Sequence, residues 1–159
     1  MYRIVVFTVF LFGVLADECL RKCGKLFDPD NMACCLKTPL VSAGTFDMKE
    51  CMDMPFEQED CKREECFAKK KGYVEPDGSI NLAKLEEVLK KEFGNAEFVT
   101  NVKNVCFKDL SIYGPTEMCE ILKMGRCVQT QILKFCTEWS DEGRCNGIME
   151  LFEECSKNI

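Results

Sequence analysis

The sequence predicts an all-α fold, a disulfide-stapled bundle of about six or more helices. Three observations predict it. Apolar residues recur at helical spacing through most of the chain after residue 60. Cysteine is frequent, with 13 in 159 residues. No segment shows the run of alternating apolar and polar residues that a half-buried strand would need.

The first sixteen residues have the pattern of a secretory signal peptide. Arg3 gives a positive start, and residues 4–15 form an apolar run that is too short to span a bilayer. A buried N-terminal helix is the alternative interpretation. We therefore expect a secreted, extracellular protein with a signal peptide at 1–16 and a single helical domain over residues 17–159.

Secretion decides how the cysteines are interpreted. In an oxidising compartment an array this dense predicts a disulfide framework, whereas in the cytosol zinc binding would compete. The chain contains no histidine and no pair of CxxC motifs, so no metal site is expected. Thirteen is an odd number, so at least one cysteine is free or bonds another chain.

The helices follow from local signals. Residues up to about 60 show turn formers and weak periodicity, which predicts short helical pieces and loops. Asp60 is placed to cap a helix that ends at Gly72, with three lysines in its last turn. Asn81 then caps a helix over Leu82–Phe93, and Gly94 follows its end.

The C-terminal half repeats this pattern. Residues 98–106 carry apolar side chains at helical spacing. The longest helix is expected from Glu117 to about Thr137, and it is apolar around most of its circumference, which predicts a position in the middle of the bundle. A last helix places one apolar face along Cys145, Ile148, Met149, Phe152 and Cys155.

Composition excludes several classes of function. Without histidine there is no Ser–His or Cys–His catalytic arrangement and no imidazole pH switch. The net charge of −6 argues against a nucleic-acid surface, which needs a basic face. Adjacent carboxylates such as Glu86-Glu87 point apart on a helix and are interpreted as solvated. We expect neither an enzyme nor a cofactor.

The apolar residues indicate a hollow interior. The chain has 12 phenylalanines and eight methionines, and a domain of this size closes a core without so many bridges. The bridges are therefore expected to support a central apolar cavity, which Met and Phe line well. Ordinary core packing is the alternative for any one of these residues.

Several motifs resemble insect odorant-binding proteins. The middle part of the family's sequences is similar to this chain at Cys66-Phe67, Gly72, Asp77-Gly78-Ser79-Ile80, the Leu-rich helix after them and Cys106. Cys127 and Cys136, separated by eight residues, match the family's last cysteine pair. Two further features resemble the Plus-C subfamily, which has extra bridges. They are Cys34-Cys35 with the nearby Pro39, and the tail through Cys136, Trp139, Cys145 and Cys155.

The resemblance implies a bridge pattern. In that family the six core cysteines pair first with third, second with fifth and fourth with sixth. Carried onto this chain, that implies Cys35 (or Cys34) with Cys66, Cys61 with Cys127, and Cys106 with Cys136. Spacing does not define the partners of Cys19, Cys23, Cys51, Cys119, Cys145 and Cys155.

The resemblance also implies a function: a secreted carrier that binds small apolar ligands such as odorants or pheromones and moves them through aqueous lymph. An olfactory receptor or a membrane surface would be an indirect partner, and the carrier would be a monomer or dimer. Periodicity predicts the cavity lining as Phe93, Phe98, Val102, Val105, Leu122, Val128, Ile132 and Phe135.

Two alternatives stay open. One is a secreted disulfide-rich interaction protein with a solid core, acting through its acidic surface or its odd cysteine. The other is a carrier outside olfaction, for lipids or hormones.

Overall fold

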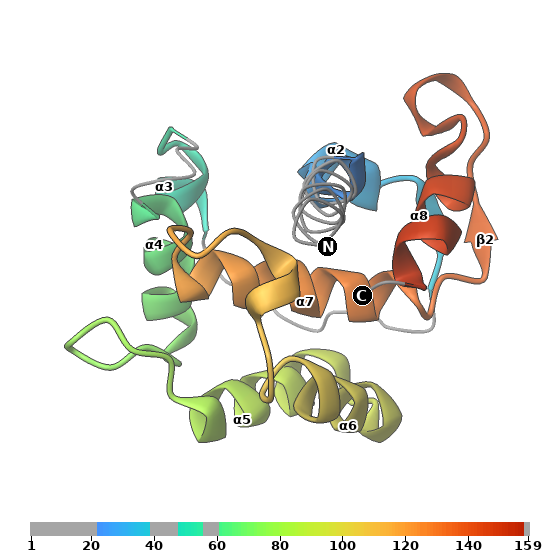
Figure 1. Ribbon diagram of the computed structural model, residues 1–159. Coiled ribbons are helices and arrows are strands. Elements are labelled where there is room, and N and C mark those ends of the chain that lie inside the picture. Colours follow the sequence, from blue (N-terminus) through green and yellow to red (C-terminus); the bar gives the residue numbers. More distant parts are fainter. Residues whose placement is uncertain (1–21, 39–47, 56–60, 158–159) are drawn as a thin grey trace, which may run out of the picture. The chain divides into compact units, whose positions relative to one another are not determined.

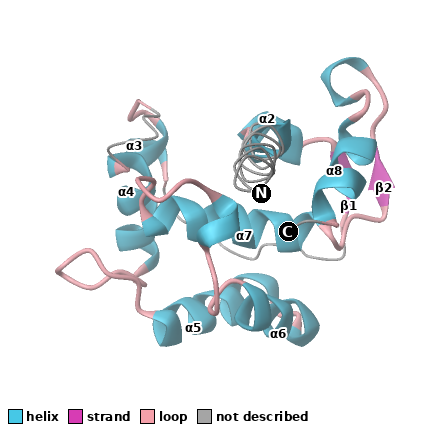
Figure 2. Ribbon diagram, in the orientation of Figure 1, coloured by secondary structure: helices cyan, strands magenta, loops and turns pink. Residues whose placement is uncertain are grey.

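The computed structural model describes residues 22–38, 48–55 and 61–157, and these are mostly helical, as the sequence predicts (Figures 1 and 2). The chain divides into two compact units, residues 1–36 with 138–159 and residues 37–137. We call them the terminal unit and the central unit. A single domain is predicted over residues 17–159, and the structure adds this subdivision. The predicted signal peptide and Asp60 lie outside the described residues.

The terminal unit brings together two described segments, residues 22–36 and 138–157, through short elements. They are η1 (Gly24–Phe27), α2 (Pro29–Met32), β1 (Cys35–Lys37, which ends in the central unit), β2 (Glu138–Trp139), η3 (Gly143–Cys145) and α8 (Ile148–Ser156). The two strands form a small sheet. Runs of three and two residues are too short to show strand alternation in the sequence.

Disulfides and an aromatic contact hold this unit. Cys23–Cys155 joins the N-terminal segment to α8, and Cys34–Cys145 joins the segment before β1 to η3. Trp139 stacks against Phe152, with 5.5 Å between ring centroids. Of the apolar face predicted for the last helix, Ile148, Phe152 and Cys155 are buried, whereas Met149 is exposed. Cys145 precedes the helix and lies in η3.

The central unit contains the longer helices. They are α3 (Lys49–Met52), α4 (Lys62–Lys71), α5 (Leu82–Phe93), α6 (Ala96–Val105), η2 (Ser111–Tyr113) and α7 (Glu120–Leu133). Helix α7 (orange in Figure 1) packs against α4 and α6, and α5 lies beside α6. None of the helices within the described ranges is long and apolar enough to cross a membrane.

Helix ends match their local signals. Helix α4 ends at Gly72, whose φ of 80° lies in the left-handed region that favours glycine. The Asn81 side chain accepts a hydrogen bond from the Lys84 amide at 2.9 Å and so caps α5. Asn95 caps α6 in the same way. The predicted boundaries of α5 are therefore confirmed at both ends.

The prediction for the longest helix, from Glu117 to about Thr137, is too long at both ends. Cys119 precedes α7 with an extended ψ of 148°, so the helix begins only at Glu120. At the other end the amide of Cys136 bonds the carbonyl of Leu133, a tight turn that leads the chain into β2. Its burial is as predicted, because buried residues face several directions around α7.

The implied bridge pairings are wrong. The structure pairs Cys51 with Cys66, Cys61 with Cys119, and Cys106 with Cys127. It does not pair Cys35 with Cys66, Cys61 with Cys127 or Cys106 with Cys136, and Cys34 bonds Cys145. Cys35 and Cys136 are also disulfide-bonded, and Cys19 lies outside the described residues.

The implied pairings differ from the observed ones because helix packing decides which cysteines come close enough to bond. Cys106 ends α6 and meets Cys127 on the buried face of α7, whereas Cys136 lies beyond the end of α7. Cys61 and Cys119 precede α4 and α7, so their bridge ties together the starts of two packed helices. The six cysteines from Cys51 to Cys127 still pair first with third, second with fifth and fourth with sixth.

Candidate functional site

An apolar cavity of about 190 Å³ lies between α5 and α7 in the central unit, and we call it the α5–α7 cavity. Most of its lining is aliphatic or aromatic, and a small polar group comes from the end of α4 and from α5. The lining residues are Lys71, Tyr73, Leu85, Val88, Leu89, Glu92, Phe93, Met124, Gly125, Val128 and Ile132.

The helical repeat builds these walls. On α7, Met124, Val128 and Ile132 are four residues apart, which places them on one face of the helix. Buried Leu85 and Leu89 repeat in the same way on α5. Gly125 is exposed, and a Cβ atom added to it would meet no atom within 4 Å. The rim of the cavity at Gly125 is therefore open.

The polar part of the cavity is an ion pair with a phenol. Lys71 Nζ lies 2.8 Å from Glu92 Oε1 and donates a hydrogen bond to Oε2 at 3.0 Å. Burial, and then the charge of Glu92, raises the pKa of Tyr73 to about 12. The Tyr73 hydroxyl is therefore protonated at neutral pH and is a hydrogen-bond donor. The Lys71–Glu92 pair and the Tyr73 hydroxyl therefore give one side of this otherwise apolar cavity polar groups.

The structure brings three of the eight predicted lining residues into this cavity: Phe93, Val128 and Ile132. Phe98 lies behind Phe93, with 4.8 Å between ring centroids, and is fully buried in the core. Phe135 contacts Phe98 in turn, with centroids 6.0 Å apart. These aromatic rings support the wall from behind.

The other three predicted residues lie elsewhere. Val102 is completely buried in the core. Leu122 packs against Cys61 and Met118, in a cluster at the start of α7. Val105 is half-buried in the last turn of α6 and lines neither this cavity nor the one described next. Periodicity identified inward-facing residues without distinguishing core from cavity.

Sequence reasoning missed Lys71, Tyr73 and Glu92. One signal was present for Glu92, which continues the apolar stripe of Leu85 and Leu89 at helical spacing. A carboxylate on the buried face of a helix requires a partner. That partner is Lys71, which belongs to a run of three lysines that the helix dipole alone is enough to explain.

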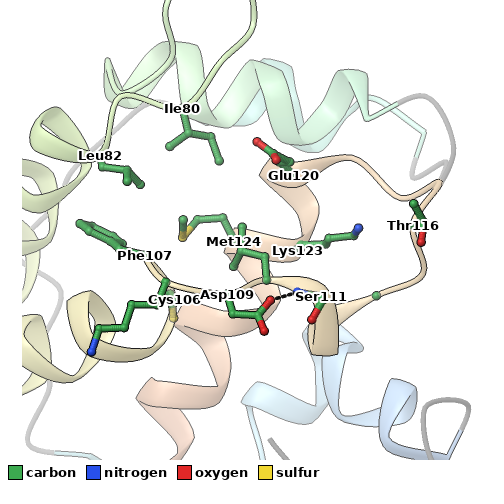
Figure 3. A pocket seen from close by; sticks show the side chains of 13 residues that line it. Ile80, Leu82, Cys106, Phe107, Asp109, Ser111, Thr116, Glu120, Lys123 and Met124 are labelled. Atoms are coloured by element: carbon green, nitrogen blue, oxygen red, sulfur yellow. Dashed lines mark hydrogen bonds between the residues drawn. The ribbon is translucent and has the colours of Figure 1, made fainter. Parts of the chain in front are cut away.

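A second cavity, of about 490 Å³, lies on another side of α7, and we call it the Lys123 cavity (Figure 3). Met124 lines both cavities. The lining residues are Ile80, Leu82, Cys106, Phe107, Lys108, Asp109, Leu110, Ser111, Gly114, Thr116, Glu120, Lys123 and Met124. The set mixes apolar, hydroxyl and charged side chains.

Comparisons with known proteins provide no family for this chain. It matches no protein-family model, no curated protein and no solved structure. The cavities and the bridge pattern are therefore the basis for a functional proposal.

Proposed function

We propose that this chain is a secreted, non-catalytic carrier that reversibly binds small hydrophobic molecules in the α5–α7 cavity and moves them through aqueous fluid. Odorants and pheromones are the ligand class that the resemblance implies. The observation that carries the proposal is the aliphatic wall of Met124, Val128 and Ile132 facing α5 across an unfilled space. Burial of apolar ligand surface there contributes about 25 cal/mol per Å².

The disulfides support the same proposal. In the central unit six successive cysteines have the interlocked pairing implied by the resemblance to odorant-binding proteins, although on a different set of cysteines. These bridges tie α3 to α4, α4 to α7 and α6 to α7. They restrain α7, which forms one wall of the cavity, whereas α5, the other wall, carries no cysteine.

The size and polarity of the cavity limit the ligand. Its volume of about 190 Å³ is below the roughly 300–1,000 Å³ of pockets for drug-sized ligands. The cavity therefore suits a molecule smaller than a typical drug. The Tyr73 hydroxyl and the Lys71–Glu92 pair favour a ligand with one hydrogen-bonding group on an aliphatic body.

Calorimetric titration with octan-1-ol tests the proposal in the oxidised chain. We expect saturable binding with a Kd of tens of micromolar, equivalent to about −6 kcal/mol. Gly125→Leu places a side chain into the open rim and should weaken binding at least tenfold. Gly125→Ala is the matched control, since it improves helix propensity without reaching across the cavity. Absence of saturable binding in the parent chain, or equal binding by all three chains, would contradict the proposal.

A further inference from the structure

Lys123 is buried along its stem, while its ammonium group stays accessible from the cavity and has no counter-ion in the part of the chain that the structure describes. The residue is only 8% exposed, and lysine is almost never buried unless it is paired. Lys71, which lines the α5–α7 cavity, is by contrast paired with Glu92. Within the described ranges no acidic oxygen lies within 4.0 Å of Lys123 Nζ and no acceptor bonds it.

The cavity around Lys123 has an apolar and a polar side. Figure 3 shows Ile80, Leu82 and Phe107 on one side, with Met124 between them and Lys123. The Lys123 side chain runs from α7 toward the opposite side, where Ser111 and Thr116 lie. The cavity therefore offers an apolar surface at one end and an ammonium group at the other, on the side of Thr116 and of Ser111, whose hydroxyl bonds the Asp109 carboxylate.

From this arrangement we propose that the Lys123 cavity binds an aliphatic carboxylate, whose anionic head pairs with Lys123 and whose tail lies against Ile80, Leu82 and Phe107. A carboxylate gives the Lys123 ammonium the partner that it lacks, and charge-assisted hydrogen bonds of this kind are the strong ones. The apolar side contributes by burying the tail. This site is separate from the α5–α7 cavity and takes a different chemical class of ligand.

Three further charged groups line the cavity. The Asp109 carboxylate accepts the Ser111 amide at 2.8 Å, and this bonding holds its pKa below the usual range. Asp109 is therefore ionised, and it is exposed in the cavity lining, so its carboxylate opposes an incoming anion as Glu120 does. Lys108 and Glu120 are exposed, so water screens them. Glu120 opposes an incoming anion, which makes its removal informative.

Titration of the oxidised chain with octanoate at neutral pH tests the assignment. We expect saturable binding that Lys123→Met weakens at least tenfold, because methionine keeps an apolar stem and removes the charge. Lys123→Arg should retain binding within a few fold. Lys108→Met is the matched control at the same cavity and should change affinity less than twofold, while Glu120→Gln should tighten binding. Acetate, a head without a tail, should not bind measurably.

The two proposals fail separately. Equal octanoate affinity of the parent and Lys123→Met chains would overturn this inference and leave octan-1-ol binding untouched. Loss of octanoate binding in Gly125→Leu, with no effect of Lys123→Met, would place the acid in the α5–α7 cavity and also overturn it. The urea midpoint of Lys123→Met should stay close to that of the parent, since the substitution breaks no ion pair and keeps the apolar stem, so weaker binding would not reflect unfolding.

Discussion

Replacing Glu92 with glutamine removes one charge from the ion pair that lines the α5–α7 cavity. The Glu92 side chain is 6% exposed and that of Lys71 is 29% exposed, with 2.8 Å between Nζ and Oε1. Breaking a fully buried pair costs about 3–5 kcal/mol, whereas an exposed pair contributes about 0–1 kcal/mol. Since one partner is buried and the other is partly solvated, we expect a loss of about 2 kcal/mol in the free energy of unfolding.

Urea denaturation at neutral pH, followed by circular dichroism, measures this loss. Glu50→Gln is the matched control, because it makes the same chemical change in the Lys70–Glu50 pair. That pair has a similar 2.9 Å separation, but its glutamate side chain is 78% exposed. We expect the control to cost less than about 0.5 kcal/mol. Equal losses in the two variants would show that burial does not strengthen the Lys71–Glu92 pair, and would refute the reasoning.

Three further predictions concern stability. Gly114→Ala places a Cβ against Met118 Sδ, so that side chain must move and unfolding should become easier by about 1 kcal/mol; an unchanged urea midpoint would contradict this. Replacing both Cys61 and Cys119 with serine removes a disulfide between residues 58 positions apart. The free energy of unfolding, measured by heat or urea, should fall by up to about 4 kcal/mol. A loss below about 1 kcal/mol would show that the other bridges already impose the restraint. Burial and Glu92 raise the pKa of Tyr73 from 10.0 to about 12. The neutral Tyr73 side chain therefore makes its full contribution to the free energy of unfolding below pH 10. That contribution is lost as the pH rises from about 10 to 12, by up to about 3 kcal/mol. Tyr73→Phe should remove that part of the decline, and identical alkaline slopes would contradict the assignment.

The parts of the fold that the sequence predicts are those with local causes. Asn81 and Gly94 define both ends of α5, because a side-chain cap and a left-handed residue act within one turn of the helix. The start of α7 is different. Cys119 is extended where its bridge to Cys61 joins α7 to α4, and a contact between residues 58 positions apart leaves no trace in local spacing.

The same distinction explains the site. Periodicity along α7 correctly placed Val128 and Ile132 on an inward face, because a face is a local property of a helix. Whether that face meets a core or a cavity depends on which helix packs opposite, so Phe98 was predicted to line the cavity and instead lies in the core. Cysteine pairing depends on the same long-range packing, which is why the implied bridges were assigned to the wrong cysteines.

The most direct test of the carrier proposal is to locate a bound ligand by nuclear magnetic resonance. Octan-1-ol added to the oxidised, methyl-labelled chain should give intermolecular nuclear Overhauser effects to the methyl groups of Met124, Val128 and Ile132, which line the α5–α7 cavity. Exposed Leu36 and Ile112 serve as internal controls and should show none. Effects confined to those exposed methyl groups, or no effects at ligand concentrations that saturate the calorimetric titration, would contradict the account.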